Sequence, residues 1–427
     1  MGINTTKVYD NVDTLIVQII SSNRYYEVNA DLQVDPLNII IDKNPGNIQV
    51  GIDGETLYGT ENSPYEIWCI EDLVEWSKNY SQYETNYIKL GQSLNFKSEL
   101  SYFDCTTNLY NEVFSITDKN VTLFEILNNT NSIGFIPIES FSGVFDGAKH
   151  ELKNIYINSS LNHVGLFANS DGIIFNLIIS GKIIQNSPYD ANSNCGGIVG
   201  EAKENCNINN CTNYTSISSN SYAGGIAGRS KGIINSCINY ADIENNFVVG
   251  GICGTGNATI TNCINIGNIT ANTYCAAGIL GGDYWSTKAV IYNCCNKGNI
   301  TCKESSIYAK PGGIFGYMTN AINSLDIINC YNVGNISSTL NWNNFSGSII
   351  AIIRTITPNT HNCFYLETGP AQTSIATPYS KSYMQSQDFI DELNNYINSN
   401  TDGIDTKGWT QWIQGEDGYP TLNFNNL

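Results

Sequence analysis

The chain has 427 residues and a formal net charge of −19 at pH 7, from 39 acidic and 20 basic side chains. This charge argues against nucleic acid and anionic membrane surfaces as partners, because both repel an acidic protein. With 41% hydrophobic residues the chain can bury a large core, and no stretch approaches the 18 apolar residues of a membrane-spanning helix.

Residues 1–62 are predicted to form a small β module. Short apolar runs at residues 15–20 and 39–41 alternate with turn signals at 44–47 and 53–54. Because the module precedes the repeats described below, we expect it to serve attachment or oligomerisation; a cap on the end of the repeats is the alternative. The N-terminus lacks the basic segment and apolar run of a secretory signal, so no export signal is predicted.

Residues 63–140 are predicted to be an entry segment with one short helix. Residues 63–66 have the form of a capping box, which would start the helix early. We favour a start near Glu71 and an end near Tyr80, because acidic side chains then lie at the positive end of the helix. Residues 87–138 are less regular, and we expect the first imperfect coils there, with an inserted loop.

Residues 141–369 are predicted to form a solenoid, and five repeats lie between residues 195 and 344. Each repeat opens on a glycine pair or its remnant, followed by Ile-x-Gly, and a cysteine comes 12 to 17 residues after that pair. An isoleucine stands three residues before each cysteine, an asparagine two after it and an isoleucine six after it. The cysteines are Cys211, Cys237, Cys263, Cys294 and Cys330, and the asparagines are Asn213, Asn239, Asn265, Asn296 and Asn332.

The repeat length and composition predict an all-β fold, a right-handed parallel β-helix or solenoid. Short β-branched runs between glycine and asparagine turns are typical of stacked coils, each of which buries its apolar face against its neighbours. Helical repeats of similar length would need apolar residues at i, i+3, i+4 and i+7, and glycine and asparagine interrupt these units too often. The isoleucine at −3 has the opposite parity to the cysteine, so a corner must lie between them.

The cysteine column could be a metal or redox site, or a stacked apolar column in the solenoid interior. We favour the interior column, because small thiols suit an inward position and no Cys-x-x-Cys pair offers zinc geometry. The asparagine column is interpreted as a ladder of amides that hydrogen-bond from coil to coil. We therefore predict no metal and no cofactor. The 14 cysteines fit folding in a reducing cytoplasm.

The period decays towards the C-terminus. Residues 345–369 keep a spacing of 16 from Gly347 to Cys363 and form a degenerate sixth repeat. Residues 370–427 are predicted to be a C-terminal α/β cap with one amphipathic helix, which starts at Ser386 and places its apolar residues on one face. Together with the apolar residues that follow, we expect this segment to cover the open end of the solenoid.

The repeats resemble those of the GLUG-motif family, which occurs in bacterial surface adhesins and in the N-terminal regions of some large secreted proteases. The resemblance is carried by the Gly-Gly-Ile-x-Gly openings and by Asn-Cys-x-Asn-x-Gly-x-Ile, and it extends from about residue 65 to the end. It implies a solenoid, with a short strand at 66–68 before the helix. It implies no reaction.

Few residues in the sequence could carry chemistry. His150, His163 and His361 are scattered, with no metalloprotease motif, and the one Gly-x-Gly at 254–256 lacks the setting of a phosphate loop. Glycosidase chemistry needs only two carboxylates about 5 to 10 Å apart. Asp283 and Glu304 in neighbouring coils are the weak catalytic candidates.

The longer repeats carry aromatic residues in what should be loops. Extra residues must leave the core, and those at 281–289, 302–310 and 338–344 bring Tyr284, Trp285, Tyr308 and Trp342. Aromatic faces beside polar side chains suit sugars or protein surfaces, so these four are the predicted binding residues. Folding back of the same rings over a coil edge is the alternative.

The function predicted from these features is that of a non-enzymatic recognition protein, a phage virion appendage that folds in the host cytoplasm. Its expected partners are a host surface glycan or protein, and other virion proteins through residues 1–62, with a homo-oligomer, more specifically a trimer, as the assembly. A bacterial surface or secreted adhesin module, located outside the cell, is one alternative. A polysaccharide-degrading tailspike enzyme is the other.

Overall fold

The structure is a computed structural model of the 427-residue chain. It describes residues 14–19, 24–29, 59–62, 64–68, 70–78, 86–96, 132–190, 192–283, 288–303, 309–318, 323–338, 346–353, 356–399 and 402–424.

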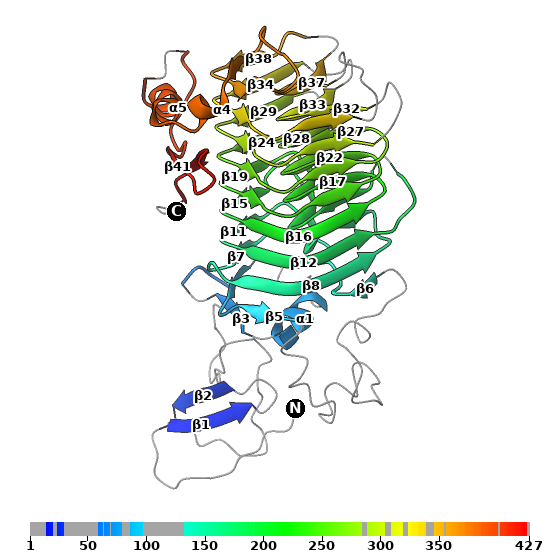
Figure 1. Cartoon of the computed structure of the whole chain (residues 1–427). Coiled ribbons are helices and arrows are strands. Elements are labelled where there is room, and N and C mark those ends of the chain that lie inside the picture. The colour runs from blue at the N-terminus through cyan, green and yellow to red at the C-terminus, as the bar shows by residue number, and fades with distance from the viewer. Residues whose placement is uncertain are drawn as a thin grey trace.

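One coil of the repeat region contains four short strands. In the first full repeat these are β13 (Asn194–Gly196), β14 (Val199–Ala202), β15 (Asn207–Asn209) and β16 (Thr212–Ser219). Each strand pairs in parallel with its counterpart one coil further on, so that four sheets run along the solenoid (Figure 1). The predicted all-β, parallel solenoid is confirmed.

The first two sheets contain the strands on either side of the glycine pair. Sheet I is six-stranded and consists of β9 (His163–Val164), β13, β17 (Tyr222–Gly224), β22 (Val248–Gly250), β27 (Cys275–Ala277) and β32 (Lys310–Gly312). Sheet II is seven-stranded and consists of β10 (Phe167–Ser170), β14, β18 (Ala227–Ser230), β23 (Cys253–Thr255), β28 (Leu280–Asp283), β33 (Phe315–Met318) and β37 (Ile350–Ile353).

Sheet III holds the strands that precede the cysteines. It is ten-stranded and consists of β3 (Tyr65–Ile67), β4 (Tyr87–Leu90), β7 (Val144–Asp146), β11 (Ile173–Phe175), β15, β19 (Ile233–Asn235), β24 (Thr259–Thr261), β29 (Lys288–Tyr292), β34 (Ser324–Ile328) and β38 (Asn359–His361).

Sheet IV holds the strands that follow the cysteines, in 15 strands. They are β5 (Leu94–Asn95), β6 (Ser132–Gly134), β8 (Glu151–Ser159), β12 (Ile178–Gln185), β16, β20 (Ile238–Asn239), β21 (Ile243–Asn245), β25 (Ile264–Asn265), β26 (Ile269–Ala271), β30 (Cys295–Asn296), β31 (Ile300–Cys302), β35 (Tyr331–Asn332), β36 (Ile336–Ser338), β39 (Phe364–Leu366) and β40 (Thr377–Tyr379). Only β6 joins it antiparallel.

A corner lies between sheets III and IV, where the parity change predicts it. The residue before each cysteine has a left-handed backbone, with φ between 50° and 55° at Asn210, Ser236, Asn262, Asn293, Asn329 and Asn362. Asparagine tolerates this conformation better than most residues do. The isoleucine columns on both sides of the corner stay in register from coil to coil, and their side chains form the interior, as at Ile208, Ile234 and Ile260.

The entry segment agrees with the later of the two helix starts. Strand β3 precedes helix α1 (Ile70–Lys78), which ends two residues before the expected position. Trp76 of this helix is buried against the rings of Phe141, Phe145 and Phe167, at centroid distances of 5.8, 5.5 and 6.1 Å. Helix α1 therefore closes the first coils. Within residues 1–62, β1 (Thr14–Ile19) and β2 (Arg24–Asn29) form an antiparallel pair, and the predicted role of these residues stays a prediction.

The C-terminal segment covers the solenoid end only with its first residues, where Gln372 Oε1 accepts from Ile349 N and Ile350 N of the last coil at 2.7 and 2.9 Å. Only β40 extends sheet IV there, by pairing with β39. Helices α4 (Lys381–Met384) and α5 (Gln387–Ser399) and strands β41 (Trp412–Gln414) and β42 (Pro420–Leu422) form a C-terminal layer that lies along the side of the coils (Figure 1).

The reason is an apolar stripe on the outside of sheet IV. The residue after each column cysteine faces outward and is apolar in the later coils, where Ile264, Cys295, Tyr331 and Phe364 are all buried. The layer covers this stripe with α5 and with Trp412, whose Nε1 donates to Asn293 Oδ1 at 2.7 Å. Burial of the stripe draws the layer to the side of the solenoid.

Candidate functional site

Most of the predicted site residues lie outside the described part of the chain. This holds for Tyr284, Trp285, Tyr308 and Trp342, and for the catalytic candidate Glu304. Asp283, the other candidate, ends strand β28 and pairs in register with Met318. The binding role of the four aromatics stays a prediction.

The two repeat columns lie in the solenoid wall. All five cysteines are buried, and their thiols donate to backbone carbonyl groups, as Cys237 Sγ does to Asn235 O at 3.2 Å. Burial raises the pKa of the thiols of Cys211, Cys237 and Cys294, which keeps them protonated and poorly nucleophilic. In the described part of the chain, no group of three or more His, Cys, Asp or Glu side chains could hold a metal ion.

The asparagines form a continuous amide ladder. Asn213 Nδ2 donates to Asn239 Oδ1 at 2.8 Å, and the same bond joins each later pair at 2.7 to 2.8 Å, as far as Asn332. Each amide also donates to a carbonyl two residues on, for example Asn265 Nδ2 to Gly267 O at 2.9 Å. The ladder thus links each coil to the next. Within each coil it also holds the turn that follows the asparagine.

The glycine pair and the amide ladder are one structural unit. A Cβ atom added to the second glycine of a pair would clash with the asparagine of the ladder. At Gly251 it would lie 2.3 Å from Asn265 Cγ, and at Gly225 it would lie 2.5 Å from Asn239 Cγ. These positions must therefore be glycine. The sequence shows both motifs, but their contact is visible only in the folded chain.

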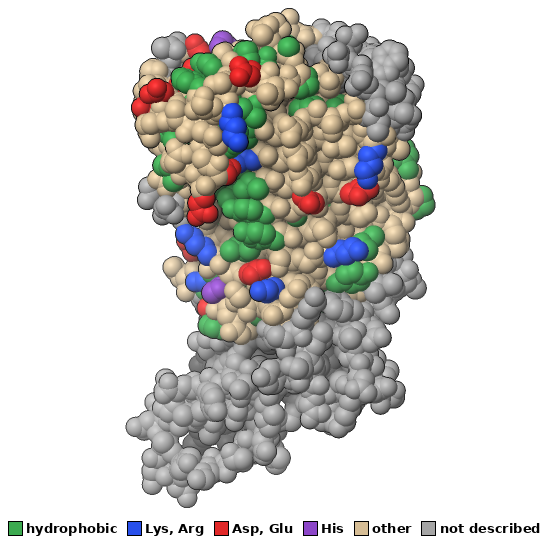
Figure 2. Space-filling view, viewed as in Figure 1, with side chains coloured by type: hydrophobic (Ala, Val, Ile, Leu, Met, Phe, Trp, Pro, Cys, Tyr) green, Lys and Arg blue, Asp and Glu red, His purple; other side chains and the backbone are tan. Residues whose placement is uncertain are grey.

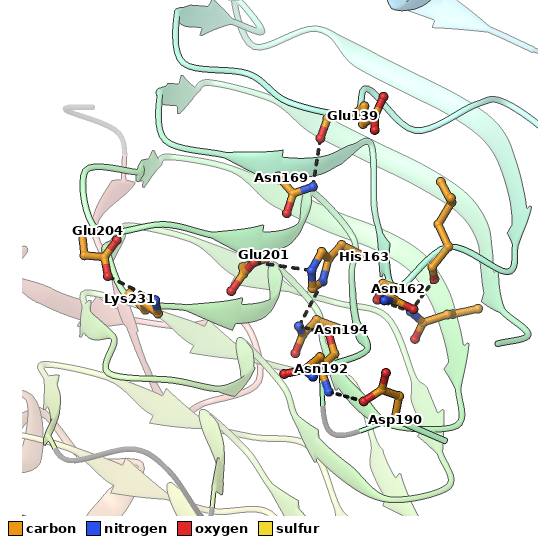
Figure 3. A network of polar contacts seen from close by, with 12 residues as sticks. Glu139, Asn162, His163, Asn169, Asp190, Asn192, Asn194, Glu201, Glu204 and Lys231 are labelled. Atoms are coloured by element: carbon orange, nitrogen blue, oxygen red, sulfur yellow. Dashed lines mark hydrogen bonds and ion pairs between the residues drawn. The ribbon is translucent and has the colours of Figure 1, made fainter. Parts of the chain in front are cut away.

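A polar cluster in sheets I and II surrounds His163 (Figure 3). Asn194 Nδ2 lies 3.1 Å from His163 Nδ1, and His163 Nε2 lies 3.4 Å from Glu201 Oε2. An amide nitrogen can only donate, so Nδ1 accepts and Nε2 carries the proton towards Glu201. Asn194 is held in turn by its bond to Asn192 O at 2.9 Å.

This cluster favours a neutral, fixed imidazole. Burial lowers the pKa of His163, while Glu201 opposes the shift and Arg229 adds to it. In the described part of the chain, the ring's hydrogen bonds and ion pairs involve only Asn194 and Glu201. Both ring nitrogens are engaged and no hydroxyl or thiol is among these partners, so the cluster is not set up as a nucleophile and its base. Its neighbour Cys195 is buried, which raises the pKa of its thiol.

An exposed pair of tyrosines lies on the outer face of sheet IV. Tyr214 and Tyr240 are 48% and 40% exposed, although they belong to strictly regular coils. Their rings stack with centroids 4.6 Å apart and planes within 8°. The centroid distance is close to the spacing of paired strands, so the rings stack along the solenoid axis.

The tyrosine pair continues the stripe that the C-terminal layer covers. Beyond Tyr240 the next coil places Ile266 at the same position, and this side chain packs against the layer. On the other side, Ser180 of β12 is in register with Tyr214, and its Oγ donates to Glu151 Oε1 at 2.5 Å. Figure 2 shows this face, with a strip of hydrophobic side chains and charged groups at its lower end. We call Glu151, Ser180, Tyr214 and Tyr240 the tyrosine face.

Sequence reasoning missed the tyrosine face, although a signal was present. Both tyrosines stand three residues after a column cysteine, in consecutive repeats, at a position whose parity is opposite to that of the buried asparagine. Attention to the outward positions would have found them. The predicted binding aromatics all lie where the period is broken, whereas these two tyrosines lie in regular coils.

Comparisons with known proteins rest on structure alone. No family model and no curated protein matches the sequence, so the likeness to GLUG-motif repeats is not carried by a family match. One solved structure, a protein from Bacteroides ovatus provisionally named an immunoglobulin A1 protease, matches 86% of this chain and 94% of its own, with a TM-score of 0.52 and 19% identity. Another, named IgA1 protease, matches 70% of this chain and 21% of its own, with a TM-score of 0.38 and 15% identity.

These neighbours correct one prediction. The protease name of the first neighbour contradicts the prediction that this chain is not an enzyme, and that prediction is wrong on this finding. At 19% identity the likeness itself establishes the solenoid fold. The first neighbour is not named as a phage or virion protein, so the virion hypothesis has no support from it. No helix among the described residues is long and apolar enough to cross a membrane.

Proposed function

We propose that this chain is a surface or secreted β-solenoid that binds a macromolecular ligand through its tyrosine face and takes part in the proteolysis of that ligand. The observation that carries the binding role is the exposed stack of Tyr214 and Tyr240. Exposed aromatic area on a rigid sheet is costly in water and typical of recognition surfaces.

The proteolytic part rests on the first structural neighbour. That protein shares the solenoid over 94% of its length and bears the name of an immunoglobulin A1 protease, so immunoglobulin A1 is the ligand to test first. A rigid solenoid suits this role, because it can hold an extended ligand against many coils without paying much ordering entropy of its own.

The test uses the full chain and purified immunoglobulin A1. Binding is measured by surface plasmon resonance, and cleavage by gel electrophoresis and mass spectrometry of the products. We expect binding that weakens at least tenfold in the Tyr214→Ala, Tyr240→Ala double variant, together with fragments that are absent without the chain. A chain of wild-type stability that neither binds nor cleaves immunoglobulin A1 would overturn the proposal.

One observation favours a second candidate, the virion appendage. All 12 cysteines in the described part of the chain are free thiols, which fits folding in a reducing cytoplasm better than export through an oxidising compartment. Fractionation of producing cells separates the two. Chain on the cell surface or in the medium supports the first proposal, whereas chain found only in phage particles supports the second.

A further inference from the structure

We propose that Tyr214, Ser180 and Glu151 form a subsite for one pyranose ring of an uncharged oligosaccharide. This inference rests on the proposed function, because it names the chemistry that the tyrosine face recognises. It concerns a face made of regular coils and not the loops in which the sequence predicted sugar binding.

The first step is that one face of the Tyr214 ring is open. Tyr240 covers the face towards β20, with ring centroids 4.6 Å apart and planes within 8°. On the opposite side, β12 places Ser180 in register with Tyr214. A serine side chain is too small to cover a phenol ring, so a flat group can continue the stack above it.

The second step is that the other end of the stack is closed. The residue after Tyr240 in the column is Ile266, which is half-buried and packs against the C-terminal layer. A ligand ring can therefore extend the stack only at Tyr214. This gives the subsite one position.

The third step is the polar group at the edge of this position. Glu151 Oε1 accepts from Ser180 Oγ at 2.5 Å, which holds the carboxylate beside the open ring face. Lys182 is exposed on the same outer face of β12. A ring above Ser180 would thus meet an aromatic surface on its flat side and a carboxylate acceptor at its edge.

A pyranose matches this arrangement. Its axial C–H groups form a flat apolar face that packs on an aromatic ring, and its equatorial hydroxyls donate to a carboxylate at the edge. An anionic sugar is disfavoured, because its charge would lie near Glu151 in a chain of net charge −19. The stated ligand is therefore an uncharged hexose or N-acetylhexosamine.

The experiment is a glycan array that spans the common uncharged hexopyranoses and N-acetylhexosamines in α and β linkage, followed by calorimetry with the best oligosaccharide. We expect Tyr214→Ala to weaken binding about tenfold, as for the loss of one stacking partner. Tyr214→Phe keeps the ring and should bind within about threefold of wild type. Glu151→Gln should weaken binding measurably, because an amide is a poorer acceptor than a carboxylate.

The matched control is Tyr189→Ala. Tyr189 is 56% exposed but packs on Phe247, away from Ser180 and Glu151, so its loss should leave sugar binding unchanged. Thermal unfolding of every variant checks that the fold is retained.

Two outcomes overturn the inference. One is the absence of binding to every sugar on the array. The other is binding that Tyr214→Ala leaves unchanged. Failure of this inference is distinguishable from failure of the proposed function. If immunoglobulin A1 still binds through Tyr214 after its glycans have been removed enzymatically, an aromatic side chain of immunoglobulin A1 occupies the stack. In that case the sugar subsite is refuted and the proposed function is retained.

Discussion

At the scale of single residues, the fold depends on contacts between two motifs that lie far apart within each repeat. The second glycine of a pair lies against the amide of the asparagine in the same coil, as Gly251 does against Asn265. The asparagine needs this space because its amide must reach the neighbouring coil, from Asn265 Nδ2 to Asn296 Oδ1 at 2.7 Å. Neither residue can change alone.

The first prediction is that Gly251→Ala destabilises the chain by at least about 2 kcal/mol, the usual cost of forcing atoms into a packed interior. The added Cβ would lie 2.1 Å from Gly278 O and 2.3 Å from Asn265 Cγ. Urea denaturation measures the change. Ser218→Ala, on the exposed face of β16, is the control and should change stability by less than about 0.5 kcal/mol. Equal stability of the two variants would mean that the ladder can shift.

The second prediction concerns pH and His163. Its pKa is lowered in the folded chain by burial, against an ordinary value of 6.5. The unfolded chain then binds more protons than the folded chain between the lowered pKa and 6.5, so stability falls as pH drops through this window. Glu201 and Asp190 face the ring and oppose the shift, while Arg229 and Lys203 add to it.

Urea denaturation between pH 7.5 and 5 tests this in the wild type and in His163→Gln. In the variant, the free energy of unfolding should depend less steeply on pH, because the contribution of the His163 ring is missing. His150→Gln, outside the network of Figure 3, is the control and should retain it. A wild-type slope that survives His163→Gln would assign the pH dependence to other groups.

At the scale of elements, the C-terminal layer is attached by a few specific contacts. Trp412 is buried and its Nε1 donates to Asn293 Oδ1, while Asn262 exchanges two bonds with the segment from Gly408 to Thr410, at 2.9 Å each. The corner asparagines thus have two roles: they adopt the left-handed backbone of the turn, and they hydrogen-bond to the C-terminal layer. Tyr331 contacts the rings of Phe389 and Trp412 at 5.6 and 5.3 Å, which anchors α5 and β41 together.

The third prediction separates the packing of Trp412 from its hydrogen bond. Trp412→Ala should cost about 3 to 5 kcal/mol, as for a large side chain removed from a core. Trp412→Phe keeps most of the apolar area and should cost about 1 kcal/mol, the usual net value of one hydrogen bond. Thermal and urea unfolding measure both. If the two variants are equally unstable, the hydrogen bond and not the packing holds the layer.

At the scale of the whole molecule, stability is close to a sum over coils, because each coil contacts mainly its neighbours. The coils from Cys211 to Cys237 and from Cys237 to Cys263 have the same length of 26 residues and pair strand by strand. One coil can therefore be removed if the register is kept. A deletion of the wrong length would turn every following strand over.

The fourth prediction is that deletion of residues 212–237, one period of 26, leaves a cooperatively folding solenoid. Asn239 would take the place of Asn213 against Gly197, and the C-terminal layer would keep its contacts with Asn262 and Asn293. Deletion of residues 212–236 is the matched control, since it is one residue short of the period. Circular dichroism and urea denaturation should show a folded chain only for the first. Two folded deletions would argue against a register set by the columns.

The sequence by itself determined the solenoid and the corner before each cysteine, because period and parity along the chain reflect stacking of identical coils. The columns at Cys211, Asn213 and their equivalents needed no tertiary information, since every coil repeats the same local environment. The helix positions of α1 and α5 followed from local patterns of apolar and acidic residues, to within about two residues.

Only the tertiary structure decided what lies outside the coils. The position of the C-terminal layer depends on the outward-facing apolar stripe that includes Tyr331 and Phe364. The sequence alone does not show which segment will pack against such a stripe. The open face of Tyr214 depends on the small residue one coil away, Ser180, 34 positions earlier in the chain. The repeat period determines the features that all coils share. A binding surface forms where one coil differs from its neighbour, and this difference becomes visible only when the folded chain places the two coils side by side.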